Sequence, residues 1–425
     1  MKYALPPPLA VPAQTPRFQE KREALLQAAV AVFNEHGVKG ATLADIAGRV
    51  GLATNSVTYY YRKKEDLAIA CALRAIDLHD AIVAEAATQP TVPERVLRYL
   101  TGHAAALAEM ERGERPPAMH FNDLLALPSP QADEAWARYT EMFRRVRGLL
   151  KGPETASLGR RERNARGHLL LSAALWLRVW LWQYEPAQYV RMAAVAADVM
   201  LHGVAGGPAA WPAADALPEA GWRLMPRSGD GADESTEAAD AFLRAATALV
   251  NEQGYRGASV DKISARLNVT KGSFYHHHDN KDDLITECFE RSFAVLRAAL
   301  VQAADAPGSG GARVCAAGRA LVRFQLSDDG PLLRASATSA LPDQAHRDTV
   351  RITLHQLTQR MAGLLVDGVV DGSVRPMDTH VAAQVVVGGI NAASELRRWV
   401  SDAGPDDAAG LYARPLMLGL MAPAA

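Results

Sequence analysis

Residues 42–67 read TLADIAGRVGLATNSVTYYYRKKEDL, and residues 259–284 read SVDKISARLNVTKGSFYHHHDNKDDL. The second stretch follows the first at a constant offset of 217 positions, without a gap. Each begins with a hydroxyl residue and ends in Lys, an acidic residue, Asp and Leu. Self-similarity at a fixed spacing is typical of a structural unit that occurs more than once. The chain therefore contains two copies of at least this segment.

The repeat extends beyond these two stretches. The same offset relates Asn34-Glu35 to Asn251-Glu252, Gly37 to Gly254, Cys71 to Cys288, and Trp182 to Trp399. Between those points the register slips by a few residues, since Gly148-Leu149-Leu150 correspond to Gly363-Leu364-Leu365. Because the offset of 217 positions holds near the beginning and near the end of each copy, the sequence predicts duplication of a whole subunit.

Each quoted stretch predicts two short helices joined by a tight turn. In the first copy, Thr42 and Asp45 form a capping pattern for a helix over residues 43–50, and Gly51 supplies the turn before a helix over 54–61. In the second copy, Asn268 stands at the turn and the next helix is expected from residue 270. Because Asn tolerates the left-handed backbone that Gly adopts easily, the same turn is expected in both copies.

The rest of the chain predicts an all-α fold. Leu25, Leu26, Ala29, Val32 and Phe33 recur at helical spacing up to Gly37, and no run of alternating strands is found. Residues 203–235 are crowded with Gly and Pro, which prevents a long helix there. We expect a disordered extension at residues 1–16, heads at 17–67 and 236–284, helical regulatory domains at 68–203 and 285–425, and a linker at 204–235.

The two quoted stretches resemble the N-terminal unit of the TetR family of transcription regulators. In the first copy the residues that carry the resemblance are Gly37, Thr42, Ile46-Ala47, Gly51-Leu52 and Lys64-Glu65-Asp66-Leu67. In the second copy they are Gly254, Ser259, Ile263-Ser264, residues 269–275 and Lys281-Asp282-Asp283-Leu284. The resemblance implies two tandem units, each with a three-helix DNA-binding head and a C-terminal helical domain for ligand binding and dimerisation.

A helix-turn-helix places its second helix in the major groove, where short polar side chains reach base edges. In the first head the candidate DNA contacts are Thr42, Thr54, Asn55, Ser56, Thr58, Tyr59, Tyr60 and Lys64. In the second head they are Ser259, Thr270, Lys271, Gly272, Ser273, Tyr275, His276, His277 and Lys281. The two lysines at the start of the fourth helix are expected to hold a phosphate, because free N–H groups and the helix dipole favour an anion there.

The two heads are not equivalent. In the first, Thr58 and Asn55 depart from the family pattern, and residues 62–64 add positive charge. The second keeps the pattern better but carries Asp279, Asp282 and Asp283, which oppose phosphate. We therefore expect the heads to differ in affinity and in preferred sequence. The alternative is a ligand- or partner-binding regulatory module in which one head has lost DNA binding.

Composition narrows the class of protein. The net charge of −1 and the isoelectric point near 6.9 mean that DNA contact must come from a local patch. Three cysteines fit a reducing compartment, and the most apolar stretch, residues 169–182, is interrupted by Arg178. No catalytic or nucleotide-binding motif is found. We expect a cytoplasmic, nucleoid-associated regulator that is not an enzyme and needs no cofactor or metal.

Several residues permit two interpretations. Candidates for an effector pocket are His103, Phe121, Trp136, Phe143, His168, Phe324 and His355, although core packing explains them equally well. The run His276-His277-His278 suggests a metal, yet consecutive helical side chains point about 100° apart, which favours DNA contact or packing. Matching Cys71 and Cys288 fit either a redox switch or a buried core. The basic run from Arg160 to Arg166 fits a solvated helix start better than a second nucleic-acid patch.

The resemblance also implies pairing through the last two helices of each unit. These are expected near residues 164–183 and 186–202 in the first copy, and near 379–401 and 406–421 in the second. We expect the two copies to pair with each other, which would make the chain a covalent pseudo-dimer. A homodimer of chains with four heads is the alternative. The implied function is repression of transcription at double-stranded operator DNA, relieved by a small apolar effector.

Overall fold

The computed structural model describes residues 16–121, 131–207, 218–225, 234–277, 280–341 and 344–423. Over these residues the regular elements are helices, apart from one isolated bridge between Ala205 and Val374. The predicted all-α class is confirmed. The predicted N-terminal extension lies, except for Pro16, outside the described residues.

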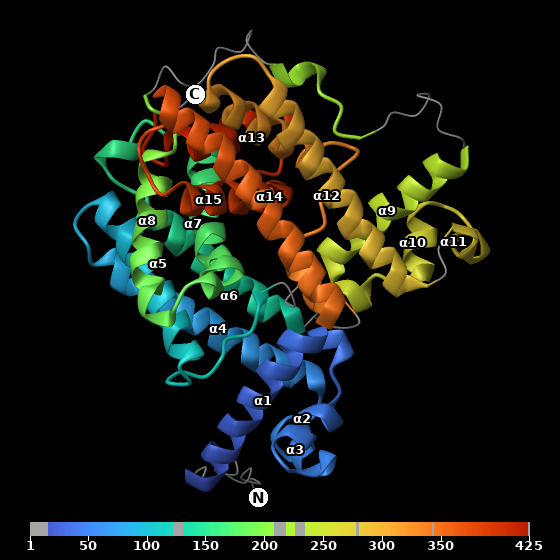
Figure 1. The fold of residues 1–425 in the computed structure, drawn as a ribbon. Coiled ribbons are helices and arrows are strands. Elements are labelled where there is room, and N and C mark those ends of the chain that lie inside the picture. Colours follow the sequence, from blue (N-terminus) through green and yellow to red (C-terminus); the bar gives the residue numbers. More distant parts are fainter. Residues whose placement is uncertain are drawn as a thin grey trace, which may run out of the picture.

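Each copy contains a comparable series of helices, which Figure 1 shows in blue to green and in yellow to red. The first comprises α1 (Pro16–Gly40), α2 (Leu43–Arg49), α3 (Thr54–Tyr60), α4 (Lys64–Ala87), α5 (Val92–Glu111), α6 (Gln131–Leu149), α7 (Arg160–Trp180) and α8 (Tyr189–His202). The second comprises α9 (Glu234–Gln253), α10 (Val260–Arg266), α11 (Lys271–His277), α12 (Lys281–Asp305), α13 (Gly310–Leu326), α14 (Gln344–Asp371), α15 (Thr379–Ala392), α16 (Leu396–Trp399), α17 (Pro405–Ala408) and α18 (Arg414–Leu418). Short connecting elements include η3 (Leu181–Gln183), η6 (Pro218–Gly221), η7 (Tyr255–Gly257), η8 (Ala335–Ala340), η9 (Ala393–Glu395) and η10 (Ala409–Ala413).

The sequence repeat is also a structural repeat. Helices α10, α11 and α12 each begin 217 positions after α2, α3 and α4. The turn between the two short helices has a positive φ in both copies, 65° at Gly51 and 55° at Asn268. The expectation that Asn preserves this turn is confirmed. The predicted bounds were slightly wrong, because α2 ends at Arg49 with Val50 as its cap, and α11 begins one residue after Thr270.

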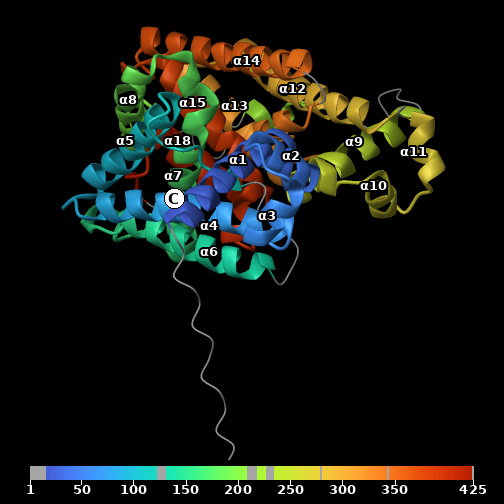
Figure 2. The same ribbon diagram turned by 90° about the horizontal axis from the view of Figure 1, so that it is seen from below.

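The two copies pack against each other through their last helices. Helices α7 and α8 contact α15, and α7 also contacts α16 and η10. Figures 1 and 2 show these segments side by side in the body of the molecule. The backbone N–H of Val204 donates to Met417 O at 2.8 Å, and that of Leu420 donates to Met200 O at 2.8 Å. We call this contact the seam between the copies.

Aromatic and charged side chains reinforce the seam. Trp399 of the second copy stacks on Phe143 of the first, with ring centroids 3.6 Å apart. Arg166 is buried and donates to the backbone carbonyls of Leu420 and Ala422. Arg161 forms ion pairs with two aspartates of the second copy, Asp402 and Asp407. The expectation that this basic run is solvated is therefore wrong for Arg166, because its donors satisfy carbonyls at the C-terminal end of the chain.

Part of the predicted linker packs on the second copy. Glu219 in η6 forms an ion pair with Arg319 of α13 at 2.7 Å, and both side chains are buried. Next to it, Arg223 N donates to Gln302 Oε1 at 3.0 Å, and Gln302 Nε2 donates back to Arg223 O at 2.9 Å. Residues 218–225 are therefore fixed to α12 and α13. The rest of the predicted linker, residues 208–217 and 226–233, lies outside the described residues.

Gly388 provides a test of the seam. A Cβ atom at this position of α15 would lie 2.6 Å from Cδ1 of Trp176 on α7, and the rigid indole ring has little freedom to move. We expect Gly388→Ala to lower the free energy of unfolding by about 1–3 kcal/mol, as measured by urea denaturation. The matched control is Gly363→Ala on α14, where a Cβ atom meets nothing within 4 Å. It should be neutral or raise stability by up to about 1 kcal/mol. Equal stability of the two variants would contradict the close packing at the seam.

Candidate nucleic-acid interface

The first head is held together by local capping and by a small apolar core. Thr42 Oγ1 accepts a hydrogen bond from Asp45 N at 3.1 Å, and the Asp45 carboxylate accepts one from Thr42 N at 2.9 Å. Val57 and Ile46 are fully buried beneath the two short helices. In the second head, Ser259 takes the same capping position and accepts from Lys262 N at 3.3 Å. The capping box predicted from sequence is therefore present in the first head.

An ion pair at the same place in each head ties the helix before the turn to the first helix. Arg49 pairs with Glu35 in the first head, and Arg266 pairs with Glu252 at 3.0 Å in the second. Together with the caps, these contacts fix α2 and α10 in the same orientation relative to α1 and α9. Figure 1 shows α3 at the lower end of the molecule and α11 at its right edge.

Most of the predicted DNA contacts in the first head are accessible. Thr42, Thr54, Asn55, Thr58 and Tyr59 are exposed, whereas Ser56, Tyr60 and Lys64 are partly buried. Tyr59 is the most prominent, with 75% of its surface exposed although its ring contacts Phe18 and Tyr60. This helix therefore presents an open polar face, with the aromatic side chain of Tyr59 near its C-terminal end.

The second head presents a similar face. Thr270, Lys271, Gly272 and Tyr275 are exposed, and Ser259 and Lys281 are partly buried. The backbones of Ser273, His276 and His277 lie in α11, whereas their side chains are outside the described residues, as is all of His278. Lys271 forms an ion pair with Asp261 at 3.1 Å, which reduces the positive charge that this helix offers.

Lys64 and Lys281 make contacts that the sequence did not predict. Lys64 Nζ donates to Ala41 O at 2.8 Å and to Lys39 O at 3.3 Å. Lys281 Nζ donates to Tyr255 O and lies 3.9 Å from the centre of the Tyr255 ring. Both ammonium groups thus satisfy carbonyls that follow the kink at the end of the first helix. Their contact with phosphate stays a prediction.

Two asparagines that were noted only as part of the repeat link each head to its regulatory region. Asn34 Nδ2 donates to Ala118 O at 3.0 Å, and Asn34 Oδ1 accepts from His120 N at 3.0 Å. Asn251 makes the equivalent pair of bonds with Leu332 O and Arg334 N, at 2.9 and 3.1 Å. Their recurrence at the 217-residue offset was the only sequence signal for this role.

A large cleft of about 920 Å³ lies between the two copies. Four of the predicted effector residues line it, namely Phe121, Trp136, His168 and His355. The other three are not among its lining residues. His103 packs on His79 with ring centroids 4.3 Å apart, Phe143 stacks on Trp399, and Phe324 lies under Arg291. Core packing is therefore the observed environment of these three.

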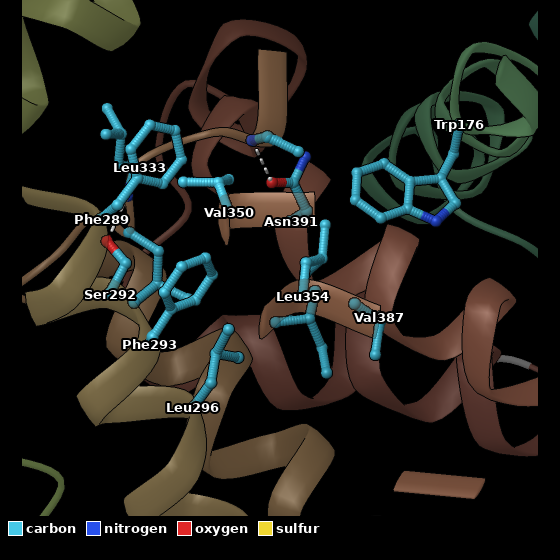
Figure 3. A pocket seen from close by; sticks show the side chains of 13 residues that line it. Trp176, Phe289, Ser292, Phe293, Leu296, Leu333, Val350, Leu354, Val387 and Asn391 are labelled. Carbon is cyan, nitrogen blue, oxygen red and sulfur yellow. Dashed lines mark hydrogen bonds between the residues drawn. The ribbon is translucent and has the colours of Figure 1, made fainter. Parts of the chain in front are cut away.

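A smaller cavity of about 30 Å³ lies within the second copy, and only Trp176 comes from the first copy. Figure 3 shows Trp176 on the opposite side of this cavity from Phe289 and Phe293. Two of its polar groups are occupied, since Ser292 Oγ accepts from Leu333 N at 2.9 Å and Asn391 Oδ1 accepts from Ala335 N at 3.4 Å, whereas Nε1 of Trp176 has no partner within the described chain. This cavity is almost wholly apolar.

Burial controls the ionisation of the interior histidines and cysteines. Burial lowers the pKa of His103 to about 3 and that of His168 to about 4, so both rings are neutral at pH 7. Burial raises the pKa of Cys71 and of Cys288 to about 12, so both remain thiols within the core. In the described part of the chain, no group of three His, Cys, Asp or Glu side chains is arranged to hold a metal ion. None of the described helices is both long and apolar enough to span a membrane.

The lysine contact in the first head can be tested by denaturation. Lys64→Ala leaves the partly buried carbonyl of Ala41 without its donor, so we expect the free energy of unfolding to fall by about 1–3 kcal/mol. The neighbouring Lys63→Ala is the control, because Lys63 is exposed. It should leave the urea midpoint unchanged. If both variants are as stable as the wild type, the Lys64 contact contributes nothing to the head.

Comparison with known proteins agrees with this arrangement. Residues 25–71 and 242–288 each match the family described as "Bacterial regulatory proteins, tetR family", and the two matches are themselves 217 positions apart. The Transposon Tn10 TetC protein of Escherichia coli is 36% identical over 64 residues, which are 15% of this chain and 32% of that protein. The uncharacterised HTH-type regulator YdeS of Bacillus subtilis is 28% identical over 169 residues, 39% of this chain and 82% of that protein.

The chain spans only about a third of the length of the first curated relatives that it matches, from 27% to 36%. Among solved structures, the TetR family regulator PfmR from Thermus thermophilus is similar with a TM-score of 0.35 and 19% identity. That match covers 41% of this chain and 95% of PfmR. The two family matches show that the chain carries the helix-turn-helix unit of the tetR family of bacterial regulatory proteins twice.

Proposed function

We propose that this chain is a sequence-specific DNA-binding transcription regulator that reads DNA with α3 and α11. The observation that carries the proposal is that each head exposes a short helix with polar side chains and a tyrosine, Tyr59 or Tyr275. In each head this helix follows a tight turn and a helix with a side-chain N-cap. A helix supported in this way fits the major groove. In this proposal residues 17–67 and 236–284 act as heads, residues 68–203 and 285–425 as regulatory domains, and the cytoplasm is the place of action.

The two copies are proposed to act as one covalent pseudo-dimer. The seam supports this, because α7 and α8 both pack against α15, which is the counterpart of α7 in the second copy. Covalent linkage replaces a bimolecular association by an intramolecular one, at an effective concentration of about a millimolar. Since operator symmetry follows protein symmetry, two diverged heads favour an imperfectly palindromic site.

The two heads are proposed to contribute unequally. In the first head, Arg62 and Lys63 are exposed beside α3 and are available to phosphates. In the second head, Lys271 is paired with Asp261, so its charge is partly neutralised before DNA arrives. This ion pair also favours the second candidate function, in which the second head has lost DNA binding and serves assembly or regulation.

Regulation is proposed to be repression that a small molecule relieves. The cleft supports this, since its lining includes the ends of the first helix of both heads, within residues 34–40 and 250–257. A ligand there can change the spacing of the heads only to the extent that it binds the non-DNA state more tightly. The asparagine ties of each head to the loops beside the cleft provide the mechanical connection.

DNA binding is testable with single substitutions in each head. On a fragment of the intergenic DNA beside its gene, we expect Tyr59→Ala and Tyr275→Ala to lower specific affinity about tenfold, since a base contact contributes roughly 1–3 kcal/mol. Lys63→Ala should weaken binding to all sequences and lower the salt slope by about 1. Fluorescence anisotropy at several salt concentrations measures both effects.

The control for these variants is Val370→Ala, which alters a side chain that is 82% exposed. Val370 lies at the C-terminal end of α14, and Figure 1 shows that this end of the helix is directed away from both heads. This control variant should bind DNA like the wild type. An effect of Tyr59→Ala with none of Tyr275→Ala would support the second candidate function. Wild-type affinity of both tyrosine variants and of Lys63→Ala would refute the assignment of α3 and α11.

Oligomeric state tests the pseudo-dimer. We expect one species of 45.6 kDa at nanomolar concentration, and one chain bound to each operator duplex. Fluorescence-detected sedimentation velocity measures both masses, and the Gly388→Ala variant shows whether loosening the seam promotes exchange between chains. A species of twice the chain mass at nanomolar concentration would instead indicate a homodimer with four heads.

A further inference from the structure

One partly buried cation in the wall of the cleft has no partner among the described residues. Arg178 lies in the last turn of α7, is partly buried and lines the cleft. Within the described residues it makes no hydrogen bond and no ion pair, and burial lowers its pKa to about 10. The dipole at the C-terminal end of α7 favours a positive charge but gives the guanidinium no acceptor. A desolvated guanidinium with unused donors is costly unless an anion supplies the missing contacts.

The other arginines of the cleft are engaged. Arg334 pairs with Glu395 at 2.7 Å, and Arg398 lies 3.9 Å from the same carboxylate. Arg347 donates to Leu341 O at 2.8 Å, and Arg351 lies 3.7 Å from Asp348. Arg178 therefore differs from the other arginines of the cleft in having no acceptor among the described residues.

The cleft as a whole carries an excess of positive charge. Its lining includes six Lys or Arg side chains and two Glu side chains, although the whole protein has a net charge of −1. The cations are Lys39, Arg178, Arg334, Arg347, Arg351 and Arg398, and the carboxylates are Glu35 and Glu395. Both carboxylates already have arginine partners. The field inside the cleft therefore attracts anions.

Arg178 has an apolar surface on one side and polar groups on the other, which suits an amphipathic molecule. Leu175 and Val179 of the same helix and the indole of Trp136 line the cleft and provide apolar surface. On the polar side stands His120, whose pKa is lowered well below its usual range by burial and then by the charge of Arg178. At neutral pH its ring is uncharged and can still donate one N–H bond. Two further buried ring nitrogens nearby, Nδ1 of His79 and Nε2 of His103, have no partner within the described chain.

We propose that the cleft binds an organic oxyanion with an apolar body, and that Arg178 receives its carboxylate or phosphate head. This inference rests on the proposed function, because it specifies the chemical class of the effector. It also adds a charged head group to the expectation from sequence, which was a small, largely apolar molecule. A guanidinium binds either head group through paired N–H donors, which gives orientation as well as affinity.

The same site is connected to the first head. His120 lines the cleft, and its backbone N–H donates to Asn34 of α1. An anion that draws His120 and Arg178 together pulls on the loop that Asn34 holds. Arg334 and Asn251 repeat this connection for the second head, since Arg334 also lines the cleft. A ligand bound in this one cleft can thus affect the position of both heads.

The test is calorimetric titration of the full chain with three probes of equal length: dodecanoate, dodecyl phosphate and the neutral dodecan-1-ol. We expect at least one of the two anions to bind tenfold or more tightly than the alcohol, and the comparison of the anions identifies the preferred head group. In Arg178→Gln, affinity for that anion should fall ten- to hundredfold, while affinity for the alcohol stays within twofold. The matched control is Arg351→Gln in the same cleft, which should retain wild-type affinity within about threefold.

Folding and DNA binding are measured on the same proteins. Because Arg178 has no partner within the described chain, Arg178→Gln should be as stable as the wild type or more stable without ligand, and should bind DNA normally. The inference is overturned if neither anion binds better than the alcohol, if Arg178→Gln binds the anions as tightly as the wild type, or if the variant is markedly less stable. Failure of the wild type to bind DNA would instead refute the proposed function, so the two failures are distinguishable.

Discussion

The seam between the copies is the contact on which the rest of the arrangement depends. It buries the last helices of the first copy against α15, α16 and the C-terminal segment, and it places buried Arg166 among carbonyls of residues 420–423. Apolar burial supplies most of the stability of such a contact, and the arginine satisfies backbone carbonyls that are buried or partly buried. Together with the contacts of α1 with η7 and η8 of the second copy, the seam sets the relative positions of the two heads and the cleft between the copies.

In the two heads, the contacts that support the backbone are alike, whereas the exposed side chains differ. Their caps, turns and Glu–Arg pairs recur at one offset because they keep two very short helices in place, and the asparagine bonds recur because they join each head to its regulatory region. The outward side chains are under no such constraint and have diverged. Tyr59 and Lys271 lie on the equivalent helices of the two heads, yet one offers an open aromatic ring and the other a paired charge. A fused chain allows this divergence, because each head faces only its own half of a site.

The sequence was least informative about residues whose role depends on both their charge or polarity and their burial in the folded chain. Phe121, Trp136, His168 and His355 could be chosen as cleft residues by type alone, but His103, Phe143 and Phe324 were chosen by the same criterion and lie in packed surroundings. Arg178 was read only as an interruption of an apolar stretch. Its importance comes from the lack of an acceptor among the described residues around it, which is a property of several helices together. The roles of Lys64 and Asn34 were hidden for the same reason, since their partners lie 23 and 84 positions away.

The sequence by itself determined the all-α class, the two copies, the helix-turn-helix units and the turn that Asn268 shares with Gly51. These features depend on caps, turns and periodicity, which act over a few residues and are visible in the order of the chain. Only the tertiary structure decided how the copies meet, that residues 218–225 dock on the second copy, and which side chains face the cleft. The contact of Tyr412 with His168 at 2.7 Å joins residues 244 positions apart. Such partners are selected by shape and burial when helices pack, and no local pattern encodes them.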